Sequence, residues 1–116
     1  MADAYRVIKV LVRKRYRQPI SLVVNMARSA IEGKQVYQRM ADVTKKFLQT
    51  NLYFAGVLLK DERLCTAVRA RKPVVLAYPK APISSSFASL AARVAGARAG
   101  DSLEDSFFRK VMRWFN

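Results

Sequence analysis

Apolar residues recur along the chain at two different spacings, which predict helices alternating with strands. Between Ala2 and about Tyr16 they lie three and four residues apart, the spacing of one face of an amphipathic helix. After Gln18-Pro19 the run Ile20–Val24 is short, continuous and rich in β-branched residues. Such a run predicts a buried strand of a parallel sheet, here one that ends at Asn25.

The same alternation continues in the middle of the chain. A helical pattern covers about Ile31 to Gln49. Its predicted buried stripe is Val36, Met40, Val43 and Phe47. The apolar run Leu52–Leu59 then predicts a strand that is covered on both faces.

The third part of the pattern begins at Asp61, which occupies the position of a helix N-cap. The helix is expected to run to about Ala70 and to bury Leu64, Cys65 and Val68. A third strand is predicted at Val74–Ala77, directly after Pro73.

A proline-punctuated loop, Tyr78 to Ile83, follows that strand. Ser84 or Ser85 is expected to cap the next helix, which stops near Gly96. That helix is expected to turn four residues inward: Phe87, Leu90, Ala91 and Val94.

Three strands separated by helices predict right-handed β-α-β crossovers and a parallel sheet. The fold class is therefore α/β, a partial Rossmann-like sheet of about three strands with flanking helices. Residues 1–96 form the predicted body, 97–101 a linker of small residues, and 102–116 a separate helix. The apolar face of the first helix needs more sheet to cover it than the sequence supplies, which predicts a missing N-terminal portion.

Residues 102–116 have the pattern of a basic amphipathic helix, with a capping-box-like start at Ser102 and Asp105. Aromatic and aliphatic residues fill one half of the helical wheel and cations the other. The predicted membrane-binding residues are Leu103, Phe107, Phe108, Lys110, Val111, Met112, Trp114 and Phe115. The pattern favours an anionic membrane surface. The alternative is a helix that docks on the body or in the groove of a partner.

Composition restricts the chemistry of the chain. It carries 22 Lys and Arg against 8 Asp and Glu, a net charge of +14, which implies an acidic partner surface. With no histidine, Ser-His-Asp triads and His-based metal sites are excluded. The single cysteine, Cys65, is expected to be a buried small hydrophobe in a reducing cytoplasm. No apolar run approaches the ~20 residues of a membrane span, so we expect neither a secreted nor an integral membrane protein.

Two basic clusters are candidate nucleic-acid contacts: Arg13-Lys14-Arg15-Arg17 and Arg69-Arg71-Lys72. No nucleic-acid-binding signature accompanies them, so solvated helix ends are the favoured interpretation. No glycine string matches a phosphate-binding loop, and no carboxylate pair stands out. The sequence therefore predicts no catalytic residue and no metal ligand in this chain.

Several short motifs occur in a fixed order along nearly the whole chain. They are Asp3-Ala4-Tyr5 with Ile8-Lys9, Asn25-Met26, Arg28-Ser29, Glu32-Gly33, Tyr37, Val43-Thr44, Phe47-Leu48, Gly56, Asp61, Ala67-Val68-Arg69, Pro73-Val74, Pro79, Pro82 and Leu90-Ala91. In this order and spacing the chain resembles the C-terminal half of the MinD/ParA-like P-loop ATPases. The resemblance is greatest to the flagellar branch called FlhG, FleN or YlxH.

The resemblance implies a nucleotide site in which Asn25 contacts adenine. The loop Tyr78, Pro79, Lys80, Ala81 and Pro82 would wall the base. A side-chain amide offers a donor and an acceptor to the base, and strand ends are where α/β folds hold ligands. From the residues alone, Asn25 is equally a turn residue at a strand end. The cofactor implied for the intact family is ATP with Mg. The family's phosphate loop and catalytic aspartates are absent from this chain, so we expect no activity and no tight nucleotide binding by it alone.

The resemblance also implies a cytoplasmic protein that associates peripherally with the inner face of the cell membrane through its last helix. It implies control of flagellar number or placement. The implied partners are an FlhF-like GTPase, flagellar switch proteins or a flagellar transcription activator, and a homodimer is expected. The alternatives are a stand-alone membrane or protein-interaction adaptor and a ParA-like nonspecific DNA-binding module.

Overall fold

A computed structural model of the chain describes residues 2–96, which divide into two compact units, residues 2–57 and 58–96. The first unit contains α1 (Ala2–Arg13), β1 (Ile20–Ala27), α2 (Ala30–Leu48) and most of β2 (Leu52–Leu59). The second contains α3 (Glu62–Arg69), α4 (Val74–Ala77) and α5 (Pro82–Val94). Each unit is described by itself.

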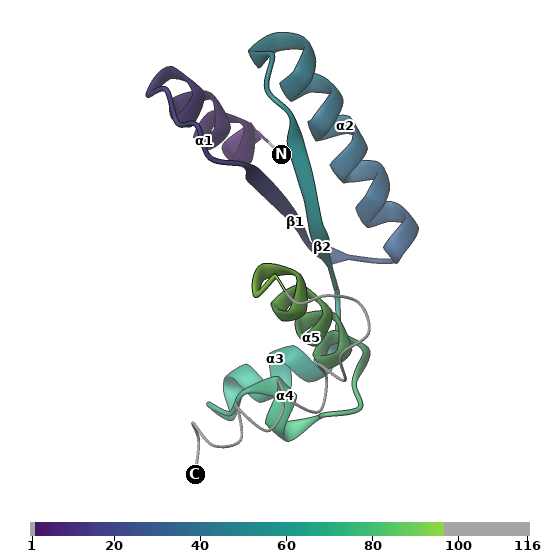
Figure 1. The fold of residues 1–116 in the computed structure, drawn as a ribbon. Helices are drawn as coiled ribbons and strands as arrows, with labels where there is room; N and C mark the ends of the chain where they lie inside the picture. The colour runs from purple at the N-terminus through teal and green to yellow at the C-terminus, as the bar shows by residue number, and fades with distance from the viewer. Residues whose placement is uncertain (1, 97–116) are drawn as a thin grey trace. The chain divides into compact units, whose positions relative to one another are not determined.

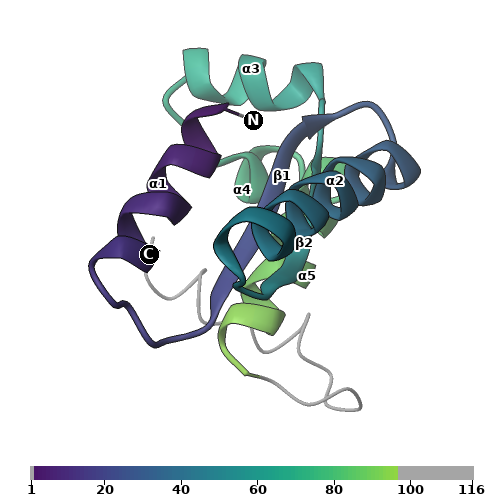
Figure 2. The same cartoon turned by 90° about the horizontal axis from the view of Figure 1, so that it is seen from above.

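The first unit is a two-stranded sheet with flanking helices. β1 and β2 pair with each other and run parallel, and α2 is the crossover between them (Figure 1). Helix α2 packs against β1, and α1 packs against α2 (Figure 2). The α/β class predicted from the sequence is thereby confirmed.

A small hydrophobic core joins the four elements of this unit. Its buried members are Ile8 of α1, Met40 of α2 and Leu52 of β2. Tyr37 links α2 to β2, because its hydroxyl donates a hydrogen bond to the backbone oxygen of Leu52 at 2.8 Å. Its ring also lies 5.0 Å from that of Phe54, so the two elements are joined by both polar and aromatic contacts.

The boundaries of the first unit follow the predicted ones closely. α2 begins after Ser29, whose hydroxyl accepts a hydrogen bond from the backbone N–H of Glu32 at 3.1 Å. β1 continues to Ala27 and does not end at Asn25. The predicted stripe of α2 was partly wrong: Met40 is buried, but Val43 is 38% and Phe47 64% exposed. The buried side of the helix also contains Gly33 and Thr44, which a purely apolar pattern does not find.

In the second unit, Asp61 caps α3 as predicted, since its carboxylate accepts a hydrogen bond from the backbone N–H of Arg63 at 2.9 Å. The predicted burial of this helix was wrong. Cys65 is exposed and Val68 is 66% exposed, whereas the small Ala67 is buried. A short helix that packs through one alanine leaves its larger apolar residues outside the core.

The third predicted strand was also wrong, because Val74–Ala77 is a short helix. The backbone N–H groups of Leu76 and Ala77 donate to the oxygen of Pro73, and that of Tyr78 donates to Val74. Proline suits the start of a helical turn, since the backbone N–H that it lacks would have no partner within the helix there. A four-residue apolar run carries too little periodicity to separate a strand from such a turn.

Helix α5 begins at Pro82 and ends at Val94, with Gly96 in the left-handed conformation (φ 69°). The predicted serine cap was wrong, because no side chain caps this helix and Ser84 is fully buried inside its first turns. Ile83 and Ala88 are its other buried residues. The predicted inward stripe is only half-buried, and Val94 is 76% exposed.

Candidate functional site

A cleft of about 300 Å³ lies at the carboxyl end of β1 in the first unit. This volume is at the lower end of those found for ligand sites. The end of β1 forms one wall, and the N-terminal parts of α1 and α2 form the others. The lining residues are Ala4, Leu22, Val23, Val24, Asn25, Met26, Ala27, Glu32, Val36 and Met40. The carboxyl end of a strand beside the start of its crossover helix is where open α/β sheets bind ligands.

Asn25 is the predicted base-contacting residue, and it lines this cleft. Its side-chain oxygen accepts a hydrogen bond from the backbone N–H of Met26 at 2.8 Å. Met26 itself has a positive φ of 56°, an uncommon conformation for a side chain of this size. The local bond uses one of the two lone pairs of the amide oxygen, so in this conformation Asn25 still offers its two Nδ2–H donors and one acceptor position.

Glu32 is the charged residue among those that line the cleft. It lies in the first turn of α2 and is half-buried. The cleft therefore combines amide donors from Asn25, carboxylate acceptors from Glu32 and apolar walls. This arrangement suits a flat molecule that carries both an acceptor and a donor at its edge.

The loop Tyr78–Pro82 belongs to the second unit, between α4 and α5. It is a tight turn, in which the backbone N–H of Ala81 donates to the oxygen of Tyr78 at 3.0 Å. The buried hydroxyl of Ser84 donates to the same oxygen at 2.7 Å and approaches that of Val74 at 3.3 Å. Ala81 is buried, Tyr78 is half-buried, and Pro79, Lys80 and Pro82 are exposed.

The residues predicted for adenine binding thus fall into two groups. The structure brings Tyr78–Pro82 together in the second unit and places Asn25 in the first. Sequence reasoning did not find the role of Ser84, which holds the loop from inside α5. Its signal was weak, because three consecutive serines lie near the start of that helix and the pattern does not say which of them is buried.

The carboxyl group of Asp61 has a lowered pKa. Hydrogen bonds from the Arg63 side chain, at 3.0 and 3.2 Å, are the largest cause that lowers the pKa of this carboxyl below 3.8. The backbone N–H of Arg63 acts in the same direction, as does that of Ile83 near the start of α5. Desolvation opposes them. Asp61 therefore has a structural role as the cap of α3.

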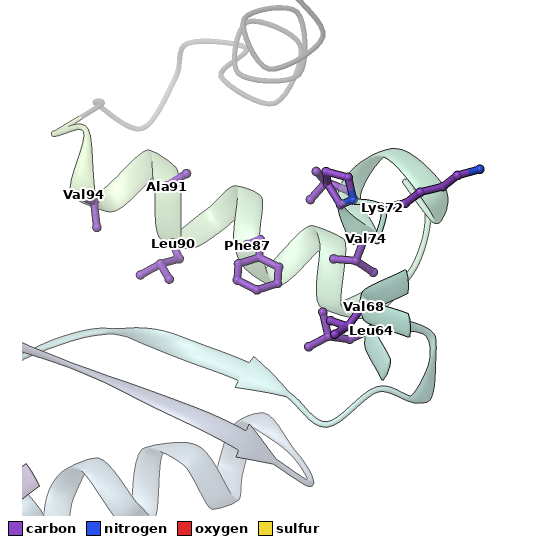
Figure 3. Close-up of a pocket in the computed structure, with 10 residues that line it drawn as sticks. Leu64, Val68, Lys72, Val74, Phe87, Leu90, Ala91 and Val94 are labelled. Atoms are coloured by element: carbon purple, nitrogen blue, oxygen red, sulfur yellow. The ribbon is translucent and has the colours of Figure 1, made fainter. Parts of the chain in front are cut away.

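An apolar groove of about 530 Å³ lies in the second unit (Figure 3). Residues from α3, α4 and α5 surround it, and Phe87, Leu90 and Val94 follow one side of α5. The remaining lining residues are Leu64, Val68, Lys72, Pro73, Val74, Val75 and Ala91. The stripes predicted to be core in α3 and α5 therefore border an open groove. It offers contact area for apolar groups, and Lys72 is the charged side chain on its border.

The predicted membrane-binding residues, Leu103 to Phe115, lie outside the described residues. Among residues 2–96, no helix is long and apolar enough to cross a bilayer. Over the same residues, no group of three or more acidic or cysteine side chains is placed to hold a metal ion.

The sequence of the chain was compared with those of known proteins. No family model matches the chain. The antiactivator FleN of Pseudomonas aeruginosa is 33% identical to it over 94 residues. These residues are 81% of this chain and 34% of FleN, so the chain spans about a third of the length of this relative. The similarity supports the predicted resemblance to the flagellar MinD-like branch.

Proposed function

We propose that this chain is the C-terminal portion of a MinD-like ATPase of the flagellar branch, acting in the control of flagellar number or placement. The observation that carries the proposal is the 33% identity to FleN over 94 residues. It is supported by the α/β crossover β1-α2-β2 and by the cleft at the carboxyl end of β1. FleN is an antiactivator by name. A role in restraining a flagellar transcription activator follows as part of the proposal.

Within such an ATPase, Asn25 would contact the adenine of ATP. The Nδ2 donors of Asn25 and the carboxylate of Glu32 line one cleft, and adenine carries ring acceptors beside an amino donor. Guanine would present a carbonyl oxygen where adenine has its amino group, and a carboxylate would repel that oxygen. The loop Tyr78–Pro82 would wall the base. The phosphates and Mg would be held by a loop that these 116 residues do not contain.

The C-terminal residues would connect this body to the membrane. The amphipathic pattern of residues 102–116 supports peripheral binding to the inner face of the cell membrane. An FlhF-like GTPase and flagellar switch proteins are further partners under this proposal. A homodimer, if formed, would strengthen membrane binding by presenting two such helices at once.

A chimera tests the proposed function. In Pseudomonas aeruginosa lacking its own FleN, the 94 residues of FleN that match this chain are replaced by those of the chain. We expect the chimera to restore the flagellar number of the parent strain. Asn25→Ala in the chimera should abolish this, whereas Asn51→Ala, at an exposed position after α2, should not. A chimera that accumulates normally but leaves flagellar number as it is in the strain lacking FleN would refute the proposal.

A further inference from the structure

The outward face of α1 combines cations with exposed valines. At about 100° per residue, positions 3, 6, 7, 10, 13 and 14 fall within an arc of about 120°, on the side opposite buried Ile8. Asp3 is the acidic residue on this face. Val7 is 60% and Val10 53% exposed. This face is therefore neither a core stripe nor a uniformly polar surface.

A fixed basic turn extends this face beyond the end of the helix. Arg13, Lys14, Arg15 and Arg17 are all exposed, and Tyr16 between them is 47% exposed. Backbone hydrogen bonds of 2.9 to 3.0 Å hold the turn, from Lys14 to Val10, Arg15 to Val12 and Tyr16 to Leu11. Arg15 has the left-handed φ of 58° that such a helix end requires. The chain thus presents these cations on an ordered backbone.

Carboxylates do little to neutralise this charge. In residues 2–96 the ion pairs are Arg6 with Asp3, at 3.8 Å and exposed, and Arg63 with Asp61. Neither pair includes a cation of the turn. Tyr16 and the two valines lie among charges that face solvent.

We propose that this surface, the α1 basic face, is a contact site for an anionic lipid surface. Its members are Arg6, Val7, Val10, Arg13, Lys14, Arg15, Tyr16 and Arg17. Cations attract lipid phosphates, while aliphatic and tyrosine side chains gain by entering the headgroup region. A duplex backbone would satisfy the cations but offer nothing to Val7 and Val10. The site is distinct from residues 102–116 and goes beyond the proposed function.

Vesicle binding of the full chain tests the proposal with two triple variants of equal net charge. Arg13→Gln, Arg15→Gln and Arg17→Gln remove the turn's cations. Lys34→Gln, Arg39→Gln and Lys45→Gln remove three exposed cations of α2. Each cation that reaches an anionic surface contributes roughly fivefold in affinity. On vesicles of phosphatidylcholine with phosphatidylglycerol, we expect the first variant to bind roughly tenfold or more weakly and the second to bind nearly as the parent does.

The apolar part of the surface has its own test. Val7→Ser with Val10→Ser should weaken vesicle binding and leave binding to random duplex DNA unchanged. Because Val7 and Val10 are exposed, the double serine variant should fold. It therefore still tests the proposal if the triple arginine variant does not fold.

Two results would overturn the proposal. Equal losses in the two triple variants would mean that only total charge matters. Unchanged vesicle binding with weakened duplex binding would assign the surface to nucleic acid. Residues 102–116 are unchanged in every variant. Neither result would therefore arise merely because the predicted membrane helix at these residues does not bind lipid.

Discussion

Gly33 of α2 lies against the side chain of Val57 in β2. A Cβ atom built on Gly33 would lie 2.6 Å from Cγ1 of Val57 and closer still to Cγ2. Real side chains do not approach so closely, so α2 takes its present position on β2 only because residue 33 has no side chain. Glycine inside a helix is otherwise unfavourable by up to about 1 kcal/mol relative to alanine. Close packing against Val57 therefore explains why a glycine occupies position 33.

Gly33→Ala should destabilise the chain by about 1–3 kcal/mol, because overpacking against Val57 outweighs the gain in helix propensity. Urea unfolding followed by circular dichroism measures the change. Adding Val57→Ala should recover part of the loss by removing the clashing methyl groups. A Gly33→Ala chain as stable as the parent would contradict this packing relationship.

The sequence predicts best those elements whose signals are long and mutually consistent. The strand at residues 52–59 matches β2 residue for residue, because eight apolar positions lie between clear breakers. The cap at Asp61 was found because a carboxylate before a helix has one obvious role. The predictions are wrong where tertiary contacts determine the secondary structure or the burial of a residue. Val74–Ala77 is too short to have a period, and the burial of Ala67 in place of Cys65 depends on how closely α3 approaches its neighbours.

The candidate site shows the same division. The role of Asn25 was implied by the family resemblance and not by its position at a strand end, and the structure places this residue in a cleft. The sequence does not reveal that the side-chain oxygen of Asn25 accepts a hydrogen bond from the backbone of Met26, a residue with a positive φ. The groove beside α5 could not be predicted from the sequence either, since periodicity marks an apolar stripe without indicating what covers it.

Ser84→Ala should destabilise the chain by about 1 kcal/mol. The loss is modest because both carbonyl oxygens keep a backbone donor: Tyr78 donates to Val74, and Ala81 donates to Tyr78. We also expect faster hydrogen exchange at the Ala81 amide, since the turn loses its internal support. Ser86→Ala is the matched control, because its hydroxyl donates to Pro82 at an exposed position. Equal effects of the two substitutions would argue against a special role for Ser84.

Asp61 should make stability depend on acid pH. Its folded pKa lies below 3.8, mainly because of the Arg63 side chain, whereas the unfolded carboxyl titrates near its ordinary value. The unfolded state therefore binds the proton more readily. The stabilising contribution is complete above about pH 4 and is lost as the pH falls through the folded pKa. Asp61→Asn and Arg63→Gln should each reduce the difference between urea midpoints measured at neutral and acid pH. An unchanged difference in Asp61→Asn would contradict this assignment.

The 116-residue chain should bind ATP weakly. Under the proposed function Asn25 would contact the base, but most of the nucleotide affinity of P-loop ATPases comes from backbone amides and a lysine around the phosphates. Titration calorimetry with ATP and Mg should detect no micromolar binding. Micromolar, Mg-dependent binding that Asn25→Ala abolishes would overturn this prediction.

Residues 102–116 should carry membrane binding through their apolar face. Phe108→Glu with Trp114→Glu places two carboxylates on that face, and we expect flotation with anionic vesicles to fall by roughly tenfold or more. Ser106→Glu with Asn116→Glu adds the same charge on the predicted polar face and should have a much smaller effect. Trp114 is the single tryptophan of the chain, so its emission should shift to shorter wavelength when vesicles are added to the parent. Equal losses in the two double variants, with no shift in the parent, would mean that net charge and not an inserted helix attracts this chain to lipid.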